Sequence, residues 1–274
     1  MKKRLKKLGL LAAICLVAGA SLAPFLCFVS LAFKTEAQVT TIPPDLWPDF
    51  SLTFFRSAVV RYGVFHYLFN SVIVAGVTTV ITVTMATLAA YGLARLSTSL
   101  AKAILMGILA CAMFPQISIV GPIWRILRTV GWLNTYQGII LPYVALTLPL
   151  AVWILAVFIR EIPEELEAAA LVDGCTRLGA LWRVILPLAV PGLFTACILC
   201  FIHAWNEFFL ALLILTDPAK QTMPVGIALF QGDYIVPWGE IAAASFITTA
   251  PLVLLVLLFQ RRIVSGLSAG AIKG

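Results

Sequence analysis

Long apolar runs dominate the chain, and six of them contain no Asp, Glu, Lys or Arg. They cover residues 8–33, 62–94, 103–124, 129–159, 184–206 and 241–260, and each is at least 20 residues long. A helix needs about 20 apolar residues to cross a bilayer. The strict alternation that marks a membrane β-strand is absent from these runs. The pattern therefore predicts an all-α, polytopic membrane protein with six transmembrane helices.

The distribution of Lys and Arg predicts the orientation of these spans, because basic residues are retained on the cytoplasmic side. The start of the chain, Met1-Lys-Lys-Arg-Leu-Lys-Lys7, holds five of the 19 basic residues and predicts a cytoplasmic N-terminus. An even number of spans returns the C-terminus to that side, where 13 of the 19 basic residues then lie. The net charge of +7 follows from this topology and requires no nucleic-acid partner.

The first apolar run has an alternative interpretation as a cleaved signal peptide. A basic start, an apolar stretch and "AGASLA" (18–23) are typical of such peptides. The apolar run continues from Pro24 to Phe33, however, which makes it too long for a signal core. We expect the segment 1–33 to be kept as a transmembrane helix.

One segment is unusually charged for so apolar a sequence. Eight of the 31 charged residues lie between Arg160 and Arg183. Pro163 suits the first position of a helix, where its missing N–H costs nothing. Glu164 and Glu165 would follow in the first turn, at the positive end of the helix. The segment therefore predicts a short helix on the cytoplasmic side.

A bend and a second short helix are expected directly afterwards. Gly174, next to Asp173, suits the left-handed conformation that ends many helices. Thr176 can cap a second helix by accepting a hydrogen bond from a backbone amide. Pro187 would end this helix before the next apolar run. The segment 163–187 is therefore predicted to form two helices joined by a bend at Asp173-Gly174.

The charged segment resembles the cytoplasmic loop of the permease subunits of ATP-binding-cassette (ABC) importers. The similarity lies in a Glu-Ala-Ala element, an Asp-Gly pair, and Pro187 in "VILP", thirteen residues after Gly174. The bend and the C-terminal "RRIVSGLSAGAIKG" are similar to the carbohydrate branch, in particular the six-span permeases of the maltose and trehalose type. The resemblance covers essentially the whole chain, including "AAYGLAR" (89–95), "MFPQISIVGP" (113–122) and "AWNEFFLAL" (204–212).

The resemblance implies the type I ABC importer permease fold and a chain that is a transport subunit, not an enzyme. The chain then divides into an N-terminal transmembrane helix (1–33), an external loop (34–63), a permease core (64–261) with a cytoplasmic coupling loop (160–186), and a cytoplasmic tail (262–274). The segment 121–136 is expected to form a short helix at the outer interface. The expected location is the cytoplasmic (inner) membrane of a bacterium or archaeon.

The resemblance also implies which residues transmit motion from the ATPase. They are Glu164, Glu165, Glu167, Ala168, Ala169, Ala170, Asp173, Gly174 and Arg177. The sequence departs from the family at Ala168, which stands where a Glu is usual. Either Glu167 takes that role from a neighbouring face, or the alanine surface matters more than the carboxylate. The tail, which is rich in small residues and expected to be flexible, is implied to contact the ATPase through Gly270, Lys273 and Gly274.

The energy source must lie in other chains. A phosphate-binding loop has Gly directly before its Lys, and none of the eight lysines follows a glycine. The resemblance therefore implies no cofactor in this chain, with ATP and magnesium bound by a partner ATPase. The implied partners are a second homologous permease, two ATP-binding ABC subunits, an external solute-binding protein and membrane lipid, with no nucleic acid.

Polar residues inside the predicted spans are candidates for the substrate path. The stretch "FIHAWNEFF" (201–209) places His203, Asn206 and Glu207 in the fifth span, which then continues beyond the uncharged run 184–206. A carboxylate in a membrane helix is costly and usually faces a partner or a hydrated path. His203 and Glu207 are four residues apart, so we expect them to share a face and to be able to pair. Glu207 would line the path or join the paired permease; Gln116 and Asn70 are lesser candidates.

The expected function is import of a sugar, such as the disaccharides trehalose or maltose, delivered by an external binding protein. One alternative is an ABC permease for another solute. A second alternative is an ion-coupled secondary transporter. Such transporters usually carry ionisable residues near the membrane midplane and discontinuous helices. Glu207 is the only charged residue in a predicted span here, which favours the ABC permease.

Overall fold

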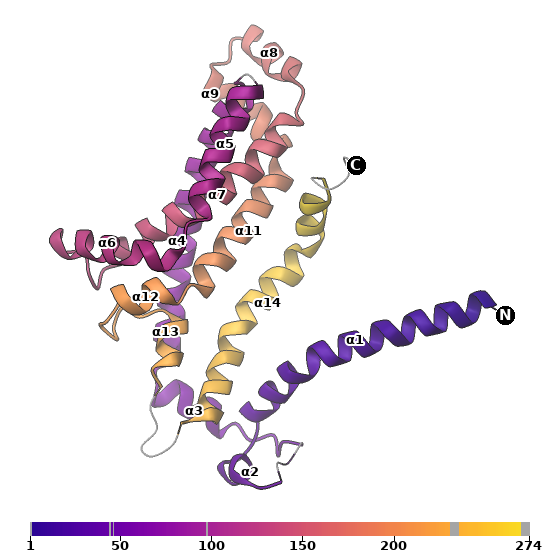
Figure 1. Cartoon of the computed structure of the whole chain (residues 1–274), viewed down its shortest axis with the longest axis vertical. Coiled ribbons are helices and arrows are strands. Elements are labelled where there is room, and N and C mark those ends of the chain that lie inside the picture. The colour runs from indigo at the N-terminus through magenta and orange to yellow at the C-terminus, as the bar shows by residue number, and fades with distance from the viewer. Residues whose placement is uncertain (1, 44, 46, 97, 231–235, 270–274) are drawn as a thin grey trace. The chain divides into compact units, whose positions relative to one another are not determined.

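The computed structural model describes residues 2–43, 45, 47–96, 98–230 and 236–269, and all regular secondary structure in these ranges is helical (Figure 1). Candidate spans lie within α1 (Lys2–Ala32), α4 (Val64–Ala94), α7 (Tyr136–Arg160) and α14 (Trp238–Ala269). Two bent helix pairs bring the number to as many as six if each pair is one span. The predicted all-α class is confirmed, with four to six candidate spans in the described part of the chain.

The chain divides into two compact units, the first formed by residues 1–65 and 226–251. Besides α1, this unit contains the short helices α2 (Glu36–Thr40) and α3 (Thr53–Val60). Phe33, Phe55 and Phe246 form an aromatic cluster with ring centroids 4.9–5.9 Å apart. Such tilted and edge-on ring contacts add to the area that the rings bury. They connect the end of α1 with α3 and the first part of α14.

The second unit, residues 66–225 and 252–274, contains the central helix packing. In it, α7 packs against α11 (Val190–Asn206) and α5 (Thr98–Ala112). The contact of α7 with α11 is close, because a Cβ atom on Gly192 would lie 2.5 Å from Cγ of Phe158. Thr82 of α4 and Thr147 of α7 are joined by a 2.9 Å hydrogen bond between their buried hydroxyls. Small residues and hydroxyl pairs of this kind suit helix packing in membranes.

The prediction of a single helix over residues 103–124 is wrong. Helix α5 ends at Ala112, and α6 (Gln116–Thr129) starts in a new direction, bent by 83° from α5 (Figure 1). Pro115 lies in the extended region and lacks the N–H that would continue a helix. Of the short helix expected over 121–136, residues 121–129 are helical and form the last part of α6, whereas residues 130–135 are not helical.

The predicted fifth span, residues 184–206, is also interrupted. Residues 177–188 form α9 (Arg177–Ala180), the π-helix η1 (Leu181–Ile185) and α10 (Leu186–Leu188). This segment meets α11 at 83°, and the break lies at Ala189. After α11 the chain forms α12 (Phe209–Ile214) and α13 (Met223–Ala228). The sequence predicted that Glu207 lies within a helix. In the structure it lies beyond the end of α11 and outside any helix.

Candidate functional site

The charged segment forms the two short helices that the sequence predicts. Helix α8 (Glu164–Val172) follows Pro163, which is the non-helical residue before the helix and not its first helical residue. Asp173 ends α8, and Gly174 has a φ of +86°, the left-handed conformation expected there. The Thr176 hydroxyl accepts a 3.1 Å hydrogen bond from the amide of Gly179 and caps α9. The bend at Asp173-Gly174 is confirmed.

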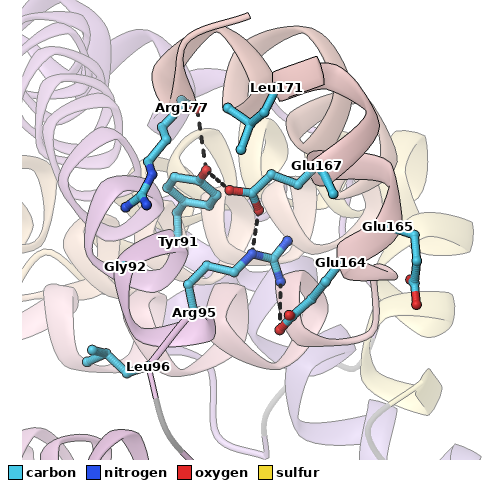
Figure 2. Close-up of a pocket in the computed structure, with 10 residues that line it drawn as sticks. Tyr91, Gly92, Arg95, Leu96, Glu164, Glu165, Glu167, Leu171 and Arg177 are labelled. Carbon is cyan, nitrogen blue, oxygen red and sulfur yellow. Dashed lines mark hydrogen bonds and ion pairs between the residues drawn. The ribbon is translucent and has the colours of Figure 1, made fainter. Parts of the chain in front are cut away.

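Glu167 lies on the inner side of α8 and contacts the end of α4. Its Oε1 accepts a hydrogen bond from the hydroxyl of Tyr91, and its Oε2 accepts one from Nε of Arg95 at 2.5 Å (Figure 2). The Nη1 of Arg95 lies 3.8 Å from the carboxylate of Glu164, whose side chain is 78% exposed. The buried carboxylate thus uses both oxygens within its own chain.

A cavity of about 620 Å³ lies beside this cluster, between the end of α4 and α8 (Figure 2). Its walls carry two basic and three acidic side chains, so a charged or strongly polar group from a partner fits it better than an apolar one. The lining residues are Tyr91, Gly92, Arg95, Leu96, Glu164, Glu165, Glu167, Ala168, Leu171 and Arg177.

Most of the residues expected to couple to the ATPase are exposed in this chain. They are Glu164, Glu165, Ala168, Ala169, Asp173, Gly174 and Arg177, whereas Glu167 and Ala170 are buried. Three large apolar side chains join the exposed set: Val172 is 87% exposed, and Leu178 and Trp182 are each 58% exposed. An apolar patch that includes a tryptophan and has a charged rim is typical of a surface that docks into a protein partner.

Sequence reasoning missed Tyr91 and Arg95 as members of this site. The signal was present in "AAYGLAR", where the two residues are four apart and therefore lie on one face of a helix. Their partner Glu167 lies 72 residues beyond Arg95. The contact follows from the fold and not from any local pattern.

The expected pairing of His203 with Glu207 is wrong. Glu207 is buried, and its carboxylate accepts hydrogen bonds from the hydroxyl of Tyr143 and from the amides of Leu210 (2.9 Å) and Ala211 (3.2 Å). His203 is exposed on α11. The reason is that α11 ends at Asn206, so the four-residue helical spacing does not extend to Glu207.

The other residues expected on the substrate path lie in different settings. Asn70 is fully buried; its amide donates to the carbonyl of Gln221 at 2.8 Å, and its Oδ1 accepts from the hydroxyl of Tyr136 at 2.8 Å. Gln116 is partly buried at the start of α6. Asn206 is exposed, three residues from His203, on the same face of α11. His203 and Asn206 therefore share an exposed face of α11. The polar atoms of Asn70 are instead hydrogen-bonded within the chain.

The tail contacts expected at Gly270, Lys273 and Gly274 lie outside the described residues. The part of the tail before them is helical, because α14 continues to Ala269. This differs from the flexible tail that the small residues indicated. In the described part of the chain, no three His, Cys, Asp or Glu side chains are grouped so that they could hold a metal ion.

Residues 82–269 match the family of binding-protein-dependent transport system inner membrane components. The chain belongs to this family, and both the Tyr91–Arg95 segment and α8 lie inside the match. It is therefore a multi-pass inner membrane component of a binding-protein-dependent transport system, and a transport subunit rather than an enzyme.

Curated relatives match the chain over nearly its full length. It is 43% identical over 264 residues to the sulfoquinovosyl glycerol transport system permease protein SmoH of Agrobacterium fabrum, covering 96% of this chain and 92% of that protein. It is 42% identical over 274 residues to the trehalose/maltose transport system permease protein MalG of Thermococcus litoralis, covering 98% of each chain. It is also 43% identical to the trehalose transport system permease protein SugB of Mycobacterium tuberculosis, over 94% of this chain and 95% of that protein.

A solved structure confirms the fold. A chain of a bacterial ABC transporter that imports the acidic polysaccharide alginate superposes with a TM-score of 0.82, covering 95% of this chain and 97% of that one, at 20% identity. At this identity the likeness concerns the fold alone. The chain has the ABC importer permease fold, as the resemblance of its charged loop predicts.

Proposed function

We propose that the chain is one permease subunit of an ATP-driven importer that moves a disaccharide of the trehalose or maltose type across the inner membrane. A second, homologous permease completes the path, two ABC subunits hydrolyse ATP on the cytoplasmic side, and an external solute-binding protein delivers the sugar. The single observation that carries the coupling role is the exposed, bent helix pair α8–α9. The similarity to MalG and SugB supports the substrate class.

The coupling surface consists of the exposed side of α8 and α9. Ala168 and Ala169 allow close approach of a partner, and Val172, Leu178 and Trp182 offer apolar contact. Glu164, Glu165 and Arg177 surround them with charge that can fix the register of docking. Ala168 at the family's Glu position leaves this surface without a central carboxylate, since Glu167 faces inward. The proposed contact with the ATPase is therefore made by the alanine surface, and Glu167 acts within its own chain.

The proposed topology places both termini and the coupling segment in the cytoplasm. It rests on the basic residues of the N-terminal segment and of residues 160–183. In this topology the loop 34–63 and the bend between α5 and α6 lie outside. The tail residues Gly270, Lys273 and Gly274 are then on the same side as the ATPase, where they contact it.

The proposed substrate path runs along the side of α11 that carries His203 and Asn206. Both side chains are exposed in the single subunit. The Nδ2 of Asn206 donates to the carbonyl of Ile202 at 2.9 Å, so its Oδ1 and the ring nitrogens of His203 are the groups proposed to bind sugar hydroxyls. Gln116 at the bend before α6 is a further contact. Glu207 and Asn70 are proposed to stabilise the subunit and not to contact the sugar, because their polar atoms are hydrogen-bonded within the chain.

A second candidate substrate follows from SmoH, whose name gives sulfoquinovosyl glycerol and whose identity to this chain is 43%. That solute is an anionic glycoside, so it differs from a disaccharide in charge. The test is to purify the complex with its binding protein and to measure ATP hydrolysis with trehalose, maltose and sulfoquinovosyl glycerol. Stimulation by trehalose or maltose is expected. Stimulation by sulfoquinovosyl glycerol alone would select the second candidate, and no stimulation by any of the three would contradict both.

A further inference from the structure

Few side chains attach α8 to the rest of the molecule. Of its nine residues only Glu167 and Ala170 are buried. An alanine methyl group buries little apolar area, so apolar packing of α8 side chains is a weak attachment. The carboxylate of Glu167 provides the side-chain hydrogen bonds that attach α8 to the end of α4.

The anchor has the geometry of a two-point attachment. Each carboxylate oxygen of Glu167 accepts one hydrogen bond, from Tyr91 and from Arg95. These two residues lie one turn apart at the end of α4, so the carboxylate is held against one face of that helix. Two hydrogen bonds fix the direction of the carboxylate as well as its position. Helix α8 cannot turn or slide on α4 without breaking one of them.

From this geometry we infer that Arg95, Glu167 and Tyr91 form a latch that makes α8 and α4 move together when the ATPase displaces α8. We call these three residues the α4–α8 latch. The inference rests on the proposed coupling role of α8. Arg95, Glu167 and Tyr91 are then positioning residues for transport, and none of them needs to touch sugar or ATP.

The end of α4 is well placed to pass motion on. Nη2 of Arg160, at the end of α7, donates a 3.3 Å hydrogen bond to the carbonyl of Leu93, so α7 is attached at the same level. Helix α4 is 31 residues long, about 46 Å at 1.5 Å per residue. Near its other end, Asn70 is hydrogen-bonded to the carbonyls of Ala219 and Gln221. A displacement of α8 thus has a continuous route to the segment at 219–221.

The ion pair of Arg95 with Glu167 is expected to add little to the stability of the folded chain. A buried ion pair adds little net stability, because desolvation offsets the attraction between the charges. Nη2 of Arg95 is buried and has no hydrogen-bond partner among the described residues, so the guanidinium is not fully satisfied. Arg95 also lies within ion-pair distance of Glu164, 3.8 Å from its Nη1, so the one guanidinium attaches α8 through two carboxylates and holds the two helices in register.

The test uses the assembled complex in proteoliposomes with its binding protein and trehalose or maltose. Glu167→Gln is expected to lower the sugar moved per ATP hydrolysed by on the order of tenfold, as expected when a charged hydrogen bond is lost. Glu36→Gln is the matched control, because Glu36 is exposed on α2, outside the coupling loop. The double variant Arg95→Glu with Glu167→Arg keeps two opposite charges and is expected to recover part of the sugar-to-ATP ratio that Glu167→Gln loses. A wild-type ratio in Glu167→Gln would overturn the inference.

A second measurement separates this inference from the proposed function, because it needs no sugar. Spin labels at Leu96 and Val172, both exposed, report the distance between the end of α4 and the end of α8. In an otherwise cysteine-free complex, one narrow distribution is expected with and without trapped ATP, and a broad one in Glu167→Gln. A distribution that stays narrow in Glu167→Gln would overturn the latch, even if sugar stimulates ATP hydrolysis. Tyr91→Phe gives the same test if Glu167→Gln does not assemble.

Discussion

The hydroxyl of Tyr143 in α7 donates a hydrogen bond to the carboxylate of Glu207, one residue beyond the end of α11. The same carboxylate accepts from the amides of Leu210 and Ala211 at the start of α12. One buried side chain therefore holds three helices where α11 ends. This arrangement explains a carboxylate in an apolar region without requiring it to touch the transported solute.

Removing that carboxylate should affect assembly before it affects sugar binding. Glu207→Leu leaves one hydroxyl and two amides buried without acceptors, a cost of about 2–5 kcal/mol in stability. We predict a reduced yield of intact complex, measured by size-exclusion chromatography, and a lower thermal midpoint. Glu207→Gln keeps one acceptor oxygen and should lose less. A normal yield of Glu207→Leu with abolished uptake would assign Glu207 to the path instead.

His203 and Asn206 should behave in the opposite way. Both are exposed on α11, so truncation leaves no buried group unsatisfied. His203→Ala and Asn206→Ala are predicted to preserve complex yield while sugar uptake falls by about threefold to tenfold each, the effect of losing one or two hydrogen bonds to hydroxyls. Uptake at wild-type levels in both variants would mean that this side of α11 lies away from the path.

Gly174 tests the bend of the coupling segment. Its φ of +86° is unfavourable for a β-branched residue, so Gly174→Val should strain the turn by about 1–3 kcal/mol. We predict that ATP hydrolysis continues while sugar uptake falls. Gly131, with a φ of +72°, is the matched control, since Gly131→Val introduces similar strain at the end of α6. Equal uncoupling by both variants would show a general effect of strain.

The tail can be tested in two steps. Deleting residues 270–274 removes Gly270, Lys273 and Gly274, and deleting residues 266–274 also shortens α14, which continues to Ala269. Both truncations are predicted to lower ATP hydrolysis by the assembled complex without preventing assembly. Hydrolysis and transport at normal rates in the longer truncation would show that the tail makes no functional contact with the ATPase.

Local sequence patterns predicted the short helices of the coupling segment well. The Asp173-Gly174 bend and the Thr176 cap follow from residue preferences that act over a few positions. The apolar runs predicted the all-α class but not the two breaks in the predicted spans. Ala189 is as apolar as its neighbours, and a proline such as Pro115 can also lie inside a helix. Pro142 and Pro149, for example, both lie inside α7.

Contacts between distant residues were beyond the sequence. Glu167 with Arg95 and Asn70 with Gln221 are separated by 72 and 151 residues, and only the packing of α4 against its neighbours brings them together. The mistaken pairing of His203 with Glu207 has a local cause. It assumed that the helix continues through Glu207, where the chain turns to satisfy the amides of α12.

The most direct test of the coupling role is a cross-link between α8 and the ATPase. A single cysteine replaces the exposed Ala169 in an otherwise cysteine-free complex, and a bifunctional reagent is added to inverted membrane vesicles with and without ATP. A cross-link to the ATP-binding subunit whose yield changes with ATP is predicted, with none from a cysteine at the exposed Val130 after α6. A cross-link from Val130 but not from position 169 would contradict the assignment of α8 as the coupling helix.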